Sequence, residues 1–220
     1  MDVFERISRL IISYGKIHPT LYLFCASMIE EQLIMEETRN LIEGCLHQDR
    51  HAQSLLYELL SKKMFGICLR YSKNKEEAEE ILQEGFMKVF QFIHQYKSSG
   101  SFEGWVRKIM MNCALQKYRS QKHMHAVVDI DTVTHDTFIN EEEIFSKIGT
   151  KELLLIIQKL SPVYRMVFNL YVFEGLKHRE IAKLLNISEG TSKSNLSDAR
   201  SILQKAINKS LQSSQNLLQI

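Results

Sequence analysis

The chain has 220 residues, of which 45% are hydrophobic and 25% are charged, and its formal net charge is +2. This balance is typical of a globular protein with one or two domains. The four cysteines, Cys25, Cys45, Cys68 and Cys113, are far apart and form no CxxC motif or Cys/His cluster. We therefore expect buried cysteines, no metal site and no disulfide framework, which favours the reducing cytoplasm.

The first 35 residues form an N-terminal extension whose role the sequence leaves open. Its apolar run, residues 21–29, is too short to span a bilayer. Asp2 and Glu5 interrupt the basic flank that a signal peptide needs. We expect neither secretion nor membrane insertion. The extension is either an additional helix or the upstream part of a chain that starts at Met28 or Met35.

Helical periodicity dominates the remaining chain, which is interrupted by few prolines and glycines. The apolar spacing of residues 36–71 predicts two packed helices. A further helix begins after Asn74, carries Glu76 and Glu77 in its first turn, and continues to about residue 93. Residues 97–101 form a loop, and the next helix is expected from about residue 102 to residue 121.

The charges are unevenly distributed over the second half of the chain. Residues 97–123 hold six basic residues and one acidic residue, residues 124–150 hold one basic and six acidic residues, and residues 161–220 hold eight basic and four acidic residues. Basic segments are how proteins meet phosphate. The acidic, weakly periodic stretch is predicted to be a flexible linker. Helices are expected at 151–160 and at 161–173, the latter beginning at the Ser161-Pro162 pair.

The last helices, expected at 177–185 and 189–211 with a tail at 212–220, have the layout of a helix-turn-helix. Asn186 suits the left-handed end of the first helix, and Ser188 suits the N-cap of the second. One face of the second helix is predicted to pack on the first, and it contains Ser192, Leu196, Ala199, Leu203 and Ile207.

The opposite side of that second helix carries short polar side chains, with Lys193 and Arg200 on its flank. Its members are Gly190, Thr191, Ser194, Ser197, Asp198 and Ser201. A short polar face beside cations is what a helix needs to read a DNA groove. A solvated face on an ordinary helical hairpin would give the same periodicity, so the pattern alone leaves both open.

The basic helix at 102–121 also suggests contact with nucleic acid. A helical wheel places Arg107, Met111, Tyr118 and Lys122 opposite a core face of Phe102, Trp105, Val106, Ile109 and Cys113. We expect Trp105 to belong to the core.

The segment HREIAKLLNISEGTSKSNLSDAR (178–200) resembles the C-terminal DNA-reading domain of extracytoplasmic-function (ECF) sigma factors of the sigma-70 family. Residues 76–119, EEAEEILQEGFMKVFQFIHQYKSSGSFEGWVRKIMMNCALQKYR, look like the other conserved domain of that family, and LSPVYRMVFNLYVFEGL (160–176) looks like the entry to the C-terminal one. The resemblance covers roughly residues 38–210, with the motifs in the family's order and spacing.

The resemblance implies an all-α protein of two small helical domains joined by the acidic linker. The region 2-like domain would span 36–123, the linker 124–149 and the region 4-like helix-turn-helix domain 150–211. Such a protein binds core RNA polymerase, through the clamp helices of the largest subunit and the flap, recognises the −35 and −10 promoter elements, and assists melting. An anti-sigma factor is a further candidate partner.

The resemblance also implies three sets of site residues. Core polymerase would contact Gln83, Glu84, Phe86 and Lys88. The melted −10 strand would contact Tyr96, Lys97, Arg107, Lys108, Asn112, Tyr118 and Arg119. In the family, the position of Tyr96 helps to capture an extruded base, which suits an aromatic stacking platform, and the position of Asn112 reads a base. The −35 duplex would contact Arg179, Thr191, Lys193, Ser194, Ser197, Asp198 and Arg200. Gln116 stands where the family often has an acidic residue and Asp198 where many members have a basic one, so the −35 preference cannot be transferred.

Two other interpretations remain at this stage. The chain would otherwise be a dimeric helix-turn-helix regulator of duplex operators, although such a protein does not need the aromatic, basic helix at 102–121. An enzyme is not expected, because the sequence shows no P-loop, HExxH motif or catalytic Ser/His/Asp arrangement, and no cofactor or catalytic residue is predicted. The linker either threads the RNA exit path of polymerase, as in the family, or is a solubilising spacer.

Overall fold

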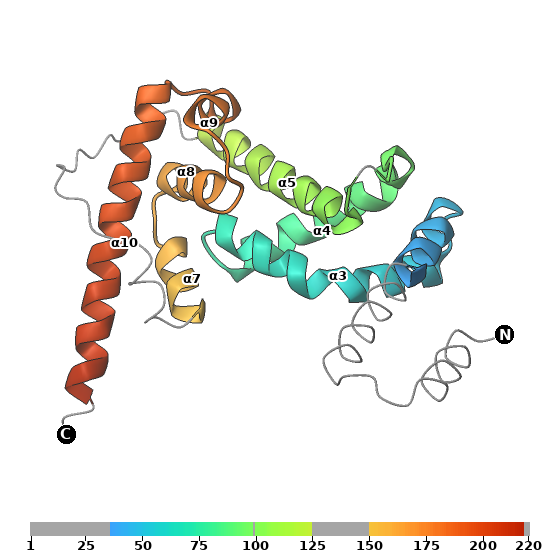
Figure 1. The fold of residues 1–220 in the computed structure, drawn as a ribbon, viewed down its shortest axis with the longest axis horizontal. Helices are drawn as coiled ribbons and strands as arrows, with labels where there is room; N and C mark the ends of the chain where they lie inside the picture. The colour runs from blue at the N-terminus through green and yellow to red at the C-terminus, as the bar shows by residue number, and fades with distance from the viewer. Residues whose placement is uncertain (1–35, 99, 125–149, 218–220) are drawn as a thin grey trace, which may run out of the picture. The chain divides into compact units, whose positions relative to one another are not determined.

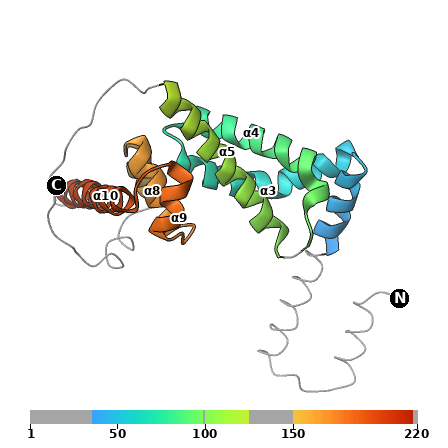
Figure 2. The same cartoon turned by 90° about the horizontal axis from the view of Figure 1, so that it is seen from above.

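The computed structural model describes residues 36–98, 100–124 and 150–217 (Figures 1 and 2). Their regular elements are helices, which confirms the all-α prediction. The chain divides into two compact units, Met1–Leu56 and Tyr57–Ile220. The predictions for the N-terminal extension and the acidic linker lie outside the described residues. Within the described ranges, no helix has the length and apolar character to cross a membrane.

The described part of the first unit contains a helix at residues 36–46 and the start of α3 (Arg50–Tyr71). Gly44 allows these segments to approach each other, because a Cβ at this position would lie 2.6 Å from the Cβ of Ala52. Gln48 adopts a positive φ of 59° in the connection, and the Asp49 carboxylate accepts a hydrogen bond from the His51 amide at 2.9 Å. The predicted pair of helices is therefore present.

In the second unit, α4 (Lys75–Phe92) begins where the sequence predicted. The Asn74 side chain accepts a hydrogen bond from the Glu77 amide at 3.0 Å, and the Glu77 carboxylate accepts one from the Lys73 amide at 2.7 Å. A short 3₁₀ helix, η1 (Ile93–Gln95), follows and leads to α5 (Phe102–Met124). Figure 2 shows α4 and α5 running side by side, and their contact buries Ile81, Val89, Val106 and Met110.

The C-terminal helices are α7 (Thr150–Gln158), α8 (Pro162–Val172), α9 (His178–Leu185) and α10 (Glu189–Leu217). Ser161 is the N-cap of α8 and Pro162 its first residue, as predicted, although the serine side chain makes no capping hydrogen bond. α10 continues six residues beyond the predicted end at 211. No glycine or proline interrupts residues 212–217, so helix propagation meets no local obstacle there.

The described cysteines fulfil the role expected of small apolar residues. Cys45, Cys68 and Cys113 are buried and form no disulfide. Burial raises the pKa of the Cys68 thiol to about 12, so it stays protonated and unreactive at neutral pH. Among the residues that the structure describes, no cluster of three His, Cys, Asp or Glu side chains could hold a metal ion.

Candidate nucleic-acid interface

The helix-turn-helix forms as predicted. Asn186 ends α9 in the left-handed conformation (φ 53°, ψ 56°), and its backbone N–H donates to the Ala182 carbonyl. The Ser188 hydroxyl accepts a hydrogen bond from the Thr191 amide at 2.9 Å and caps α10. The predicted core stripe of α10 is buried at all five positions, Ser192, Leu196, Ala199, Leu203 and Ile207.

His178 joins three helices of this domain. Its Nδ1 lies 3.0 Å from the Oγ of Ser192 on α10, and its ring stacks on Tyr171 of α8 with centroids 4.8 Å apart. Burial lowers the pKa of His178 below its ordinary value, and the Lys193 and Arg200 charges lower it further. A neutral imidazole therefore fixes the N-terminal half of α10 against α8 and α9.

The N-terminal half of α10 presents the polar face that groove reading requires. Thr191 and Lys193 are exposed, Ser194 and Ser197 are half-buried, and Arg179 is exposed on α9. The Lys193 ammonium lies 2.9 Å from the Glu189 carboxylate one turn away and lowers the pKa of that acid. Both side chains are largely exposed, so the pair is weak and Lys193 can turn to a phosphate at little cost.

Asp198, predicted on the polar face, and Arg200, predicted on its flank, are half-buried and have neighbours on α8. The Asp198 carboxylate accepts a hydrogen bond from the Tyr164 hydroxyl at 3.3 Å. The Arg200 guanidinium lies 5.5 Å from the centroid of the Tyr171 ring. Both partners are α8 tyrosines, which a helical wheel of α10 alone cannot reveal.

α5 presents Lys108, Asn112 and Arg119 as exposed side chains, with Arg107 half-buried. Lys108 and Asn112 lie about one turn apart, and Arg119 lies about two turns after Asn112. Asn112 and Lys108 share one side of the helix at i and i+4. An exposed amide beside a cation can donate to and accept from the edge of an unpaired base.

Tyr96 lies in an aromatic cluster before α5. Its hydroxyl donates to the Gly100 carbonyl at 2.6 Å, and its ring centroid lies 5.1 Å from Phe102 and 5.7 Å from Trp105. Tyr96 is half-buried, and Lys97 beside it is exposed. Trp105 was expected in the core but is only half-buried. Its ring packs against Phe102 and Tyr96 near the start of α5.

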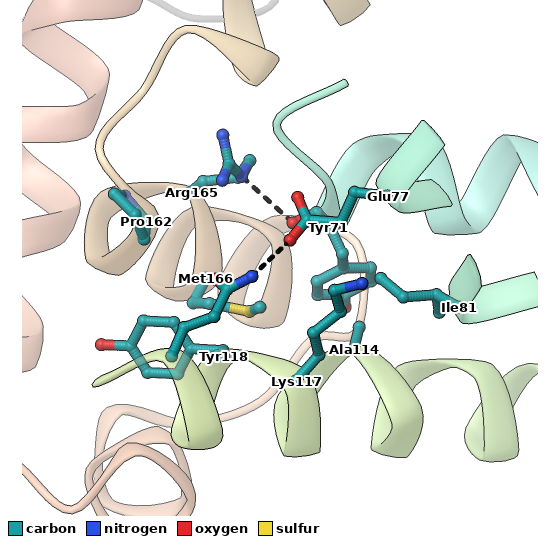
Figure 3. A pocket seen from close by; sticks show the side chains of 10 residues that line it. Tyr71, Glu77, Ile81, Ala114, Lys117, Tyr118, Pro162, Arg165 and Met166 are labelled. Atoms are coloured by element: carbon teal, nitrogen blue, oxygen red, sulfur yellow. Dashed lines mark hydrogen bonds between the residues drawn. The ribbon is translucent and has the colours of Figure 1, made fainter. Parts of the chain in front are cut away.

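Tyr118 departs from the prediction that placed it opposite the core. Its side chain is buried, at 7% exposure, and it lines a small pocket with Pro162 and Met166 of α8 (Figure 3). The helical wheel of α5 assigned a single face, the one that packs on α4, to the core. Residues of α8 line this pocket together with residues of α5, so Tyr118 faces other parts of the protein.

The predicted polymerase-binding residues of α4 separate into exposed and buried positions. Gln83 is exposed, and Glu84 and Lys88 form an ion pair at 2.6 Å. The Lys88 ammonium also donates to Gln116 Oε1 at 2.9 Å. Gln116, which stands where the family often has an acidic residue, therefore still accepts a hydrogen bond from Lys88. Phe86 needs correction as a contact residue, because it is 3% exposed and packs on Tyr57 and Phe90.

Sequence reasoning missed Met87 on this surface. Its side chain is 73% exposed and lies one turn after Gln83. The signal was available, because Met87 falls outside the apolar stripe formed by Ile81, Phe86 and Val89. A single exposed apolar side chain does not by itself indicate a contact surface, but Met87 lies on the side of α4 that the polymerase prediction uses.

The chain matches the family models "Sigma-70 region 2" over residues 56–124 and "Sigma-70, region 4" over residues 150–203. RNA polymerase sigma-H factor of Pseudomonas aeruginosa is 25% identical over 187 residues, which cover 80% of this chain and 96% of that relative. ECF RNA polymerase sigma factor SigM of Bacillus subtilis is 29% identical over 156 residues, covering 70% of this chain and 94% of SigM.

A solved complex of the sigma factor RpoE with the anti-sigma factor NepR from Bartonella quintana aligns with 18% identity and a TM-score of 0.43, over 70% of this chain and 96% of that one. The two matched regions, one containing the helix-turn-helix and the other the basic helix α5, define a DNA-binding protein of the transcription apparatus. From the two matched regions and the curated relatives, the chain belongs to the ECF group of the sigma-70 family of RNA polymerase sigma factors.

Proposed function

We propose that this chain binds core RNA polymerase, directs it to promoters through the −35 and −10 elements, and assists DNA melting, as a cytoplasmic subunit without catalytic residues of its own. The observation that supports this most strongly is the presence of both sigma regions on one chain, each with exposed polar and basic side chains on its expected helix. Residues 36–123 and 150–211 are the proposed functional domains.

The proposed −35 contact uses the N-terminal half of α10. Thr191, Ser194 and Ser197 are short, so the helix backbone can approach the base edges in a major groove closely. Lys193 and the exposed Arg179 would meet phosphates and fix the position of the helix on the duplex. Asp198 and Arg200 are assigned to holding α10 against α8.

The proposed −10 contact uses α5 and the aromatic cluster before it. Asn112 would read an unstacked base by hydrogen bonding, and Lys108 would meet the backbone beside it. Tyr96 is half-buried and would offer one part of its ring as the wall on which the base stacks. Tyr118 is withdrawn from the set because it is buried.

The proposed polymerase contact uses the exposed side of α4. Gln83 and Met87 would touch the clamp helices of the largest subunit, with Glu84 and Lys88 at the edge of the contact. Phe86 contributes by keeping α4 packed on its neighbours. The C-terminal domain would bind the flap, which places α10 near the −35 element.

Run-off transcription with purified core polymerase on a promoter library is the direct test. We expect specific transcripts only when chain and core enzyme are both present, because two modest basic surfaces gain effective concentration when polymerase holds both over one promoter. Tight, sequence-specific duplex binding by the free chain as a dimer, unaffected by core polymerase, would instead establish a conventional helix-turn-helix regulator.

A further inference from the structure

Asp198 lies beside the short polar side chains of α10 that form the proposed −35 contact. It follows Ser194 by four residues, which places both on one side of the helix, and it adjoins Ser197. All three side chains are half-buried. In a major groove, a carboxylate reads cytosine by accepting a hydrogen bond from its amino group. The direction in which Asp198 points therefore matters for base preference.

Tyr164 holds this carboxylate from the first turn of α8. Its hydroxyl donates to Asp198 Oδ2 at 3.3 Å in a partly buried bond. The bond is longer than most hydroxyl–oxygen bonds, but its charged acceptor strengthens it. Burial raises the pKa of Tyr164, and the Asp198 charge and the hydrogen bond raise it further. The phenol therefore stays protonated at neutral pH and remains a donor.

The backbones on both sides of this bond are fixed by core packing. Met166, two residues after Tyr164, is 4% exposed. Asp198 lies between Leu196 and Ala199, which are 3% and 0% exposed, and α8 packs against α10. Neither helix can turn without exposing these side chains. The freedom that remains is the side-chain rotation of Asp198, and one hydrogen bond is enough to decide between rotamers.

The hydroxyl groups next to Asp198 show what a released carboxylate would change. Ser194 Oγ donates to the Thr191 carbonyl at 3.1 Å, and the Thr191 amide donates to Ser188 Oγ at 2.9 Å. Because its proton is used inside the helix, the Ser194 oxygen is left as an acceptor. A carboxylate one turn away would add a second, charged acceptor and a preference for a base that offers an amino group.

We propose that Tyr164 is a positioning residue for −35 recognition: its hydroxyl holds the Asp198 carboxylate against α8 and thereby keeps it from reading cytosine. The inference rests on the proposed function, since it needs the polar side chains of α10 to meet the −35 duplex. The base preference of the wild type then comes from Thr191, Ser194 and Ser197. Tyr164→Phe removes the hydroxyl, keeps the ring and frees Asp198 to reach a base edge.

Three variants and one control isolate this bond. The variants are Tyr164→Phe, Asp198→Ala and the two substitutions combined. Tyr171→Phe is the matched control, because it removes a hydroxyl from the same helix while the ring can keep its contacts with His178 and Arg200. Circular dichroism and thermal unfolding of each variant verify that the helices are retained.

Selection of promoters with a randomised −35 element, using the full chain and purified core polymerase, measures the base preference. Sequencing of the bound promoters should show cytosine enriched about fivefold or more at one position for Tyr164→Phe relative to the wild type. Asp198→Ala alone and Tyr171→Phe should keep the wild-type preference, because neither adds an acceptor in the groove. In the combined variant the cytosine enrichment should disappear.

An unchanged preference for Tyr164→Phe would overturn the inference, and so would equal weakening of all sequences. Enrichment that persists in the combined variant would also overturn it, because a residue other than Asp198 would then read the base. The same shift in Tyr171→Phe would contradict it by indicating a general loosening between α8 and α10.

A parallel selection of randomised duplexes with the free chain separates this inference from the proposed function. If the wild type starts transcription with core polymerase but Tyr164→Phe keeps its base preference, only the role of Tyr164 is refuted. If the wild type never starts transcription but Tyr164→Phe gains cytosine among the duplexes that the free chain selects, only the proposed function is refuted.

Discussion

Gly85 and Gly66 lie in helix interiors, α4 and α3, but their surroundings predict opposite effects of the same substitution. A Cβ added to Gly85 would overlap the Sδ of Met110 and lie 2.8 Å from its Cε. Met110 is 1% exposed on α5, so its side chain cannot simply move into solvent. A Cβ at Gly66 would have no such neighbour within 4 Å. The two glycines therefore form a matched pair.

In a helix interior, replacing glycine by alanine raises the free energy of unfolding by about 0.5–1 kcal/mol, because the unfolded glycine chain is more flexible. Gly66→Ala should therefore raise the free energy of unfolding by this amount, with no packing cost to offset it. At Gly85 the added methyl group over-packs the contact between α4 and α5, at a cost of about 1–3 kcal/mol. We expect Gly85→Ala to be between neutral and about 2 kcal/mol less stable than the wild type, hence clearly less stable than Gly66→Ala.

Urea denaturation followed by far-ultraviolet circular dichroism measures both values. Met110→Ala alone should cost about 2–5 kcal/mol, since it leaves a cavity. In the Gly85→Ala background the same truncation should cost less, because the new methyl group occupies part of the vacated space. Equal stabilisation by Gly66→Ala and Gly85→Ala, with no coupling to Met110, would refute the close approach of α4 and α5.

Four further predictions concern the proposed surfaces and the helix-turn-helix. Asn112→Ala should reduce the permanganate reactivity of melted promoter thymines; reactivity equal to wild type would exclude base reading by this residue. Lys193→Ala should weaken all promoters alike and reduce the slope of log affinity against log salt by about one, whereas a changed preference at a single base pair would indicate a base contact. Gln83→Ala should weaken co-purification with core polymerase at unchanged stability, while Phe86→Ala should cost about 3–5 kcal/mol in the free energy of unfolding because the ring is buried; normal polymerase binding by Gln83→Ala would remove this residue from the contact. Because burial lowers the pKa of His178 from 6.5, the unfolded chain binds its proton more readily. The contribution of His178 to the free energy of unfolding should therefore be constant above about pH 6.5 and decrease as the pH falls below it. Denaturation curves measured over the acid range should show a weaker pH dependence for His178→Asn.

Local chemistry in the sequence determined the helices and several of their ends. Asn74 and Ser188 cap because their side chains reach amides three residues on, and Asn186 adopts the left-handed conformation at the turn. The core stripe of α10 follows from a 3.6-residue period, which depends only on order along the chain. Because the family motifs are themselves local, the family could also be inferred from the sequence.

Tertiary structure decided the roles of residues whose partners are distant in sequence. Tyr118 was predicted to face DNA but is buried near α8, and Asp198 hydrogen-bonds Tyr164. A helical wheel distinguishes one face of a helix from the other, but it cannot show that a second element covers the polar face. Arg165 is the clearest case. Three backbone carbonyls, one from the end of α3, supply the hydrogen bonds that allow its charge to be buried.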